Sequence, residues 1–126
     1  MADNVIITKK ARQKLMKARA GTISLPAVIG MAFGEGGADI NGVLTPAENQ
    51  TELNAELYRK AIDGYSFVND LTCRYECTLT EDELSGRYIS EIGLYDEDGD
   101  LVCIKNFTPK GKDGDMEMTF RIDDEF

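Results

Sequence analysis

The feature that most constrains the fold is a strict alternation of apolar and polar side chains at residues 71–79. The apolar members are Leu71, Cys73, Tyr75, Cys77 and Leu79, and the polar members are Thr72, Arg74, Glu76 and Thr78. Because successive side chains of a β-strand point to opposite faces, this period of two predicts a strand with one face on the core. Two of the three cysteines fall on the core side, so we expect buried, reduced thiols with a structural role.

Several other segments carry strand patterns bounded by turn residues. Strands are expected at about 27–33, from about 55, at 87–95, at 101–107 and at 116–122. Asp98-Gly99 separates the third and fourth of these and is a strong hairpin signal, because Asp and Gly tolerate positive φ. The second half of the chain is therefore predicted to form an antiparallel meander.

A short amphipathic helix is predicted near the N-terminus. Thr8 suits the N-cap, and Gly21 suits the residue just past the helix end. Between them Ala11, Leu15 and Ala18 form a narrow apolar stripe at spacings of four and three, and basic side chains cover the other faces.

The middle of the chain is expected to hold two shorter helical pieces. Pro46 suits the first position of a helix capped by Thr45. Residues 51–54 are favoured as a helical turn, although a strand also fits the pattern of 51–62. The chain has 126 residues, 42% of them hydrophobic, which suffices for one core. We expect a single α+β domain over residues 1–126, with the N-terminal helix packed on a mainly antiparallel sheet of five or six strands.

Charge is distributed unevenly along the chain, whose net charge is −9. Residues 1–21 hold six basic and one acidic side chain (net +5), and residues 22–126 hold eight basic and 22 acidic ones (net −14). An acidic body argues against nucleic-acid binding, which needs clustered Lys and Arg. A basic end on an acidic body suits head-to-tail or ring-like assembly, although a solvated helix face explains the charge equally well. The residues expected to contact an acidic partner are Lys9, Lys10, Lys14 and Lys17.

No arrangement typical of catalysis or cofactor binding is found in the sequence. The chain has no histidine, which removes the commonest general base and metal ligand. Asp96-x-Asp98-x-Asp100 can in principle hold Ca²⁺, but it departs from the EF-hand pattern, and a solvated hairpin tip is favoured. The acidic run 81–83 is expected to be a solvated loop, and the glycine-rich segment 34–37 a loop with positive φ instead of a phosphate cradle. We therefore expect no enzyme and no catalytic, metal-binding or cofactor-binding residues.

One carboxylate lies inside an otherwise apolar strand. A charge on a core strand needs a partner, and Glu91 is such a charge. We expect Arg59 to pair with Glu91 or with Glu56 and to fix the register of the strands.

Four segments of the chain, taken in order, are similar to one protein family. They are Ile7-Thr-Lys-Lys-Ala-Arg, Ala32-Phe-Gly-Glu-Gly-Gly37, Gln50-Thr-Glu-Leu-Asn-Ala-Glu-Leu-Tyr-Arg59 and Ser90-Glu-Ile-Gly-Leu-Tyr-Asp-Glu-Asp-Gly-Asp100. Their order and spacing resemble the N-terminal domain of phage tail-collar and tail-fibre proteins. Members of that family open with a short helix, carry a glycine turn after a strand, and contain an E-x-G-L-Y-D-x-x-G-x-L hairpin. The resemblance covers nearly the whole chain.

The resemblance implies a set of fold-defining positions and no catalytic residues. The implied positions are Gly34, Gly36, Gly37, Glu56, Arg59, Glu91, Gly93, Tyr95 and Gly99. Ala11 stands where many relatives have Gly. Relatives usually continue into a long, often trimeric fibre, whereas this sequence stops at Phe126. A lone adaptor, a separately encoded baseplate piece and a shortened fibre protein are all left open.

The function implied by the resemblance is structural. The chain is expected to attach a tail fibre, or to act as a collar or adaptor, at the baseplate of a contractile or flexible tail in a phage or prophage-derived particle. Expected partners are baseplate or other tail proteins and further copies of the chain, with a trimer as one form. No membrane contact is expected, because no apolar run approaches the length of about 18–20 residues that spans a bilayer.

The sequence also bears on where the protein is located and on two alternative functions. The first residues lack a signal-peptide pattern, so the chain is expected in the host cytoplasm during assembly and then in the virion tail. A stand-alone receptor- or carbohydrate-binding module of a tail tip is the first alternative, and the absence of Trp weighs against it. A carboxylate-based hydrolase is the second.

Overall fold

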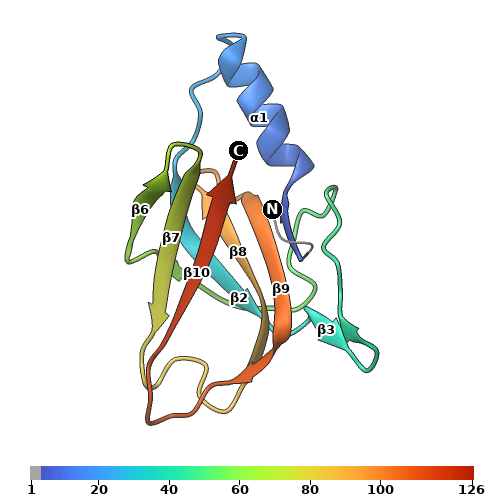
Figure 1. Ribbon diagram of the computed structural model, residues 1–126, viewed down its shortest axis with the longest axis vertical. Coiled ribbons are helices and arrows are strands. Elements are labelled where there is room, and N and C mark those ends of the chain that lie inside the picture. Colours follow the sequence, from blue (N-terminus) through green and yellow to red (C-terminus); the bar gives the residue numbers. More distant parts are fainter. Residues whose placement is uncertain (1–3) are drawn as a thin grey trace.

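A computed structural model describes residues 4–126 as one helix and ten strands (Figure 1). The elements are β1 (Val5–Ile7), α1 (Lys9–Arg19), β2 (Val28–Gly34), β3 (Ala38–Asp39), β4 (Gly42–Val43), β5 (Glu56–Ala61), β6 (Gly64–Asn69), β7 (Thr72–Leu79), β8 (Tyr88–Asp96), β9 (Leu101–Gly111) and β10 (Met118–Glu125). They form a five-stranded sheet of order β1-β9-β8-β2-β5, a three-stranded sheet of order β10-β7-β6, and the small ribbon β3-β4. All strand pairs are antiparallel. The predicted class, one N-terminal helix with antiparallel β-structure, is confirmed.

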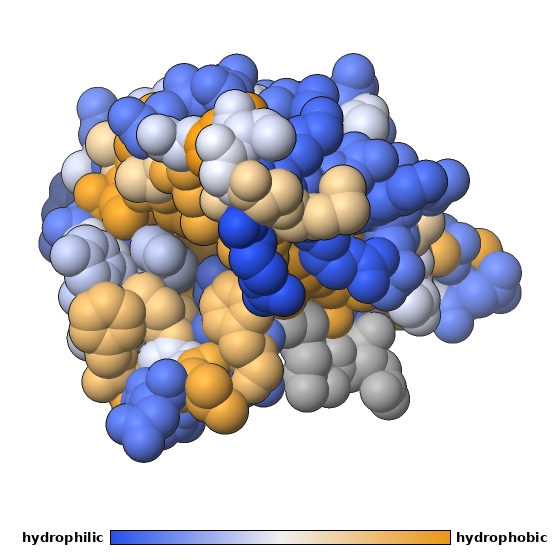
Figure 2. Space-filling view, turned by 90° about the horizontal axis from the view of Figure 1, so that it is seen from above, coloured by the Kyte–Doolittle hydropathy of each residue, from blue (hydrophilic) through white to orange (hydrophobic). Residues whose placement is uncertain are grey.

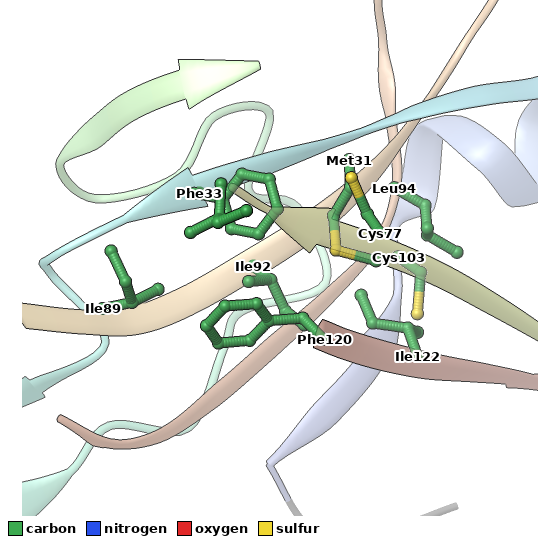
Figure 3. Close-up of a cluster of buried hydrophobic side chains, with 10 residues drawn as sticks. Met31, Phe33, Cys77, Ile89, Ile92, Leu94, Cys103, Phe120 and Ile122 are labelled. Carbon is green, nitrogen blue, oxygen red and sulfur yellow. The ribbon is translucent and has the colours of Figure 1, made fainter. Parts of the chain in front are cut away.

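The main core lies between the two larger sheets, which pack face to face as a sandwich (Figure 3). The five-stranded sheet contributes Met31, Phe33, Ile89, Ile92, Leu94 and Cys103, and the three-stranded sheet contributes Cys77, Leu79, Phe120 and Ile122. The rings of Phe33 and Phe120 meet edge to face across the two sheets, with centroids 5.3 Å apart. The core therefore joins strands from both halves of the sequence.

The alternating segment predicted at 71–79 forms the strand β7 from Thr72 to Leu79, whereas Leu71, predicted on the core side, precedes the strand and is 61% exposed. Cys77 and Leu79 are fully buried and Cys73 is half-buried. Burial raises the pKa of Cys77 to about 11 and that of Cys103 to about 12, so both thiols stay protonated at neutral pH. The prediction of a buried thiol is confirmed for Cys77, whereas Cys73, predicted on the same buried face, is only partly buried.

The predicted helix is also confirmed, with the residues named for its ends. Thr8 is the N-cap: its hydroxyl accepts the backbone N–H of Ala11 at 3.1 Å and donates to the carbonyl of Leu101 at 2.7 Å. The helix therefore starts anchored to β9. Gly21 follows the helix with φ of 80°, the conformation that favours glycine after a helix end. Of the helix's side chains, Ala11 is the one that is fully buried.

The predicted meander is wrong. β8 and β9 form the expected hairpin around Gly99, but β10 pairs with β7 along its whole length, from Met118 opposite Leu79 to Glu125 opposite Thr72. The reason is that β9 already has β8 on one side and β1 on the other. The last strand therefore belongs to the second sheet, and one sheet of five or six strands is replaced by two sheets.

The two short helical pieces are wrong as well. Residues 44–47 run without regular structure, and a turn at 48–49 follows them. This loop is tied to the large sheet instead of coiling, because the carbonyl of Leu44 accepts the side-chain amide of Asn106 at 2.9 Å. No helix forms at 51–54, and β5 starts at Glu56 after a turn at 54–55. No helix among residues 4–126 has the length and apolar character needed to cross a membrane.

Candidate functional site

The carboxylate of Glu91 on β8 is fully buried and collects three backbone N–H groups. Its Oε1 accepts from Asn54 at 2.7 Å, and its Oε2 accepts from Gly36 at 2.8 Å and from Ala55 at 2.7 Å. A buried charge is tolerated where hydrogen bonds replace its hydration. Glu91 therefore fastens two loops, one after β2 and one before β5, to the centre of the large sheet.

The glycine segment after β2 lies flat against the strand that carries Glu91. The N–H of Gly37 donates to the hydroxyl of Ser90 at 2.9 Å. A Cβ on Gly37 would lie 1.9 Å from the carbonyl oxygen of Ser90, and one on Gly34 would lie 2.5 Å from Oε2 of Glu91. A Cβ on Gly36 would lie 2.6 Å from Cβ of Asn54. The three glycines are needed for close approach, and none has the positive φ that was predicted.

The cation predicted to pair with Glu91 has a different set of partners. Arg59 on β5 forms an ion pair with Glu56 at 3.0 Å and donates to the carbonyl of Gly99 at 2.8 Å. Its guanidinium also lies over the ring of Tyr95, 4.8 Å from the centroid. The predicted pair with Glu56 is confirmed, and the pair with Glu91 is wrong because backbone N–H groups already satisfy that carboxylate. A role of Arg59 in strand register stays a prediction.

Gly93 and Gly30 provide space beside these residues. A Cβ on Gly93 would lie 2.9 Å from Cδ2 of Leu101, which belongs to a second buried cluster with Ala32, Leu53 and Ile104. A Cβ on Gly30 would enter the ring of Tyr95. No local sequence pattern indicates the role of Gly30, because its neighbour across the sheet depends on a register shift between Val28 and Gly30.

The helix is held by a cation surrounded by carboxylates. Nζ of Lys14 lies 2.6 Å from Asp96, 3.0 Å from Asp98 and 2.8 Å from Asp100, and Lys10 adds a contact of 3.2 Å to Asp100. The side chain of Lys14 is 13% exposed and that of Asp96 is 2% exposed. The predicted solvated hairpin tip is therefore wrong for Asp96, which also accepts the N–H groups of Asp98 and Asp100.

The same cluster bears on the question of a metal ion. Carboxylate oxygens of Asp96, Asp98 and Asp100 all lie within 4.8 Å of one another, as in a cation site. The ammonium of Lys14 lies among them and supplies the positive charge. Partial burial alone would lower the pKa of Lys14, but hydrogen bonds to the three aspartates raise it above its ordinary value. The cluster therefore acts as an ion-paired anchor between the β8–β9 turn and α1.

The four lysines predicted to bind a partner do not share one environment. Lys9, Lys10 and Lys17 are exposed, whereas Lys14 is largely covered by the aspartate cluster. Lys10 is exposed but engaged with Asp100. Lys9 and Lys17 therefore remain the predicted residues best placed to reach another molecule.

A second ionic cluster lies in the acidic run that was expected to be solvated. Glu83 accepts from Lys60 at 2.7 Å, from the hydroxyl of Tyr58 at 2.5 Å and from the N–H of Thr80 at 2.8 Å. Burial opposes ionisation of Glu83, but these hydrogen bonds outweigh it and lower its pKa to about 2. The group is a fixed anion that ties the β7–β8 connection to β5, so it is unsuited to acid–base catalysis near neutral pH.

A comparison of the sequence with models of protein families gives one match. The model of the family "Phage tail-collar fibre protein, N-terminal" matches residues 1–121. The chain belongs to this family, a class of structural tail-fibre domains not known for enzymatic activity, and its place is the virion tail. No curated protein sequence and no solved structure gives a significant match to the chain.

Replacing Glu91 tests its role as the acceptor for two loops. In Glu91→Gln an amide NH₂ faces backbone donors, so we expect a loss of about 3 kcal/mol in the free energy of unfolding. Urea denaturation measures this loss, and faster hydrogen exchange at the amides of residues 36, 54 and 55 locates it. The matched control Glu56→Gln, at the partly exposed pair with Arg59, should cost under about 1 kcal/mol. Equal effects of the two changes would contradict the assigned role.

Replacing Gly37 tests whether close approach explains the glycine segment. We expect Gly37→Ala to cost about 3 kcal/mol or more, because its Cβ would meet the backbone of Ser90 and one element must move. Gly64→Ala is the control, since no atom lies within 4 Å of that Cβ. The control should be neutral or slightly stabilising. Thermal and urea unfolding measure the change in the free energy of unfolding for both variants. A Gly37→Ala protein as stable as wild type would refute the explanation.

Replacing Lys14 tests the anchor of the helix. Lys14→Met leaves Asp96 buried without its cation, and we expect a loss of about 3 kcal/mol at pH 7. Lys14 first, and then Lys10, lower the pKa of Asp100 below its ordinary value of 3.8, so the stability they confer is present above that pH and is lost as the pH falls through the folded-state pKa. The difference between wild type and variant should therefore shrink below about pH 4. Lys17→Met, at an exposed lysine of the same helix, is expected to stay within about 0.5 kcal/mol of wild type at every pH.

Proposed function

We propose that this domain is an attachment module, which docks a fibre or a cap onto the baseplate of a phage or prophage-derived tail. The observation that carries the proposal is the placement of α1. The helix stands at one end of the sandwich, with the chain's C-terminus beside it (Figure 1). Family membership gives the tail as the setting and other tail proteins as the class of partner.

The charge of this end supports an acidic partner. α1 holds six basic and no acidic side chains. Three of its cations are used internally: Lys10 and Lys14 contact the aspartate cluster, and Arg12 contacts Glu48 at 2.8 Å. These bonds hold the helix in one orientation, so Lys9 and Lys17 are presented on a fixed support. A helix that is already held in place binds without the backbone entropy loss that ordering a mobile segment would cost.

The alternative of a carbohydrate-binding module has less support. The exposed aromatic rings of β6 pack on each other and on β7: Tyr65 lies 5.6 Å from Phe67 and 6.1 Å from Tyr75, centroid to centroid. Both contacts are edge-on or tilted, but Tyr65 and Phe67 stay 63% and 76% exposed, so the lower support for this alternative rests on the absence of Trp. We also infer that residues 1–126 form a single attachment domain and that several copies of it assemble. The fold-defining positions would then act by keeping the shape of this domain.

Charge reversal tests the docking surface. The other tail structural proteins of the same phage, prepared one by one, are titrated with the domain by biolayer interferometry at several salt concentrations. Lys9→Glu with Lys17→Glu should weaken binding to the docking partner about tenfold or more and should flatten its salt dependence. The control is Lys105→Glu with Lys110→Glu on β9, which changes the net charge equally. Unchanged affinity in the helix variant, or equal losses in both, would overturn this role for α1.

A further inference from the structure

The strand β6 forms an open edge of the three-stranded sheet. β7 lies on one side of it, and no strand among residues 4–126 pairs with its other side. Figure 1 accordingly shows β6 on the outer flank of the molecule. Its six residues include no charged side chain and no proline, and the register shift in its pairing with β7 falls after Phe67, near its end. Edge strands that stay unpaired are usually protected by charge, by proline or by short length.

The other edges of the two large sheets have such protection. β5 carries three charged side chains among its six residues, and β10 carries four among its eight. β1 has no charge but is three residues long. Of these four edges, β6 alone combines an uncharged sequence with a length of six residues. It is therefore the edge best suited to pair with a strand of another chain.

The side chains of β6 form an exposed apolar patch. Tyr65 is 63% exposed, Phe67 is 76% exposed and Val68 is 43% exposed. The rings of Tyr65 and Phe67 lie on the same face of the strand and meet edge to face. In Figure 2, seen from above, hydrophobic residues lie on the flank where Figure 1 shows β6. Adjoining apolar side chains that stay exposed are typical of a protein interaction surface.

The hydrogen bonds of β7 show which of its residues face β6. The N–H of Phe126 donates to the carbonyl of Leu71 at 2.9 Å, so Leu71 and every second residue after it face β10. The residues between them face β6. The carbonyl of Glu76 agrees with this assignment, because it accepts the N–H of Asp63 from the β6 side at 2.8 Å.

The open edge of β6 therefore presents the backbone of two residues. Ser66 lies opposite Arg74, one of the residues that face β6, so the backbone of Ser66 bonds to β7. Because successive residues of a strand bond to opposite sides, the N–H and C=O groups of Tyr65 and Phe67 point away from β7. Residues Tyr65 to Asn69 are all exposed, so the described chain leaves these groups accessible.

The pattern of this edge is self-complementary, and this selects β6 of a second copy as its partner. In an antiparallel pair centred on Ser66, Tyr65 of each copy lies opposite Phe67 of the other. All the outward N–H and C=O groups of both residues are then bonded. Residues opposite each other project to the same face, so each tyrosine ring gains a phenylalanine ring beside it, and such aromatic pairs stabilise a sheet. Neither strand brings a charge into the contact.

We propose that two copies of this domain pair through antiparallel β6 strands, with Ser66 at the two-fold axis. The two three-stranded sheets become one continuous sheet, and the same residues of both copies form the contact. This pairing uses no residue of α1. The proposal therefore stands apart from docking to the tail, and either can fail without the other.

A cysteine at position 66 tests the partner and the register together. Ser66 would meet Ser66 of the other copy in a non-hydrogen-bonded pair, where Cα atoms are about 4.5 Å apart, a distance that a disulfide spans. Oxidation of the Ser66→Cys chain with diamide should therefore give a covalent dimer on a non-reducing gel. In the matched variant Val68→Cys the two positions would lie roughly 13 Å apart, so it should stay monomeric on the gel. Wild type is the control for the three native cysteines.

Sedimentation velocity from about 1 µM to about 1 mM measures the association without a crosslink. Wild type should pass from monomer to dimer and form nothing larger, because the dimer uses up the open edge. Phe67→Lys removes a ring of each aromatic pair and places a charge on the edge, so we expect dimerisation about tenfold weaker or more. Tyr88→Lys is the control, the same kind of change at a 64% exposed ring of β8, and it should behave as wild type.

Several results would overturn the proposal. They are a wild type that stays monomeric over this range, a Val68→Cys chain that crosslinks as readily as Ser66→Cys, and a Phe67→Lys chain that dimerises as wild type does. Phe67→Thr replaces Phe67→Lys should the latter not give a native circular dichroism spectrum. Pairing of β6 with a strand of a different tail protein, with wild type alone monomeric, would overturn the proposal as well.

Discussion

The buried carboxylate of Glu91 is the interaction on which the rest of the structure depends. It lies on β8, the central strand of the large sheet, and accepts N–H groups from segments far away in the sequence. Without an anionic acceptor these N–H groups would be buried and unpaired, at a cost comparable to that of the lost hydrogen bonds. The loop before β5 also carries Leu53, which closes the second buried cluster. The carboxylate of Glu91 therefore fixes the path of the two loops and, through the second loop, the position of Leu53 in the second buried cluster.

A second anchor acts at the far end of the same strand. β8 ends at Asp96, whose carboxylate meets Lys14 and the backbone of the β8–β9 turn. Two places along β8, one at residues 90–91 and one at its last residue, thus position two different parts of the surface. Glu91 and Ser90 hold the base of the β3-β4 ribbon, and Asp96 holds the helix. Any surface that the domain offers to other molecules through these parts is supported by one buried strand.

The elements that sequence reasoning located are those whose signal is local. The alternation of 71–79, the Asp98-Gly99 turn and the Thr8 cap each depend on residues next to one another in the chain, and all three were confirmed. The partner of β10 was missed because alternation gives the buried face of a strand and contains nothing about which sheet edge is free. The partner of Lys14 lies 82 residues away, and no local pattern connects the two.

The glycines show a similar limit of local reasoning. Glycine after a strand indicated a loop that needs positive φ, whereas the structure uses the absence of a side chain at Gly34, Gly36 and Gly37 to bring two backbones together. Three of the four sequence blocks that produced the family resemblance meet at this place, since 34–37, 54–55 and 90–91 all contact Glu91 or its neighbour. These blocks therefore describe the internal scaffold.

Residues that contact a partner have no reason to lie within such blocks. A scaffold position is constrained by its neighbours in the same chain, whereas an exposed side chain such as Lys17 or Ile40 is constrained only by what binds it. A family match carried by scaffold positions thus defines the fold and the setting in the virion tail. The identity of the partner has to come from the exposed residues, of which Lys17 and Ile40 lie outside the four blocks and Lys9 lies within the first.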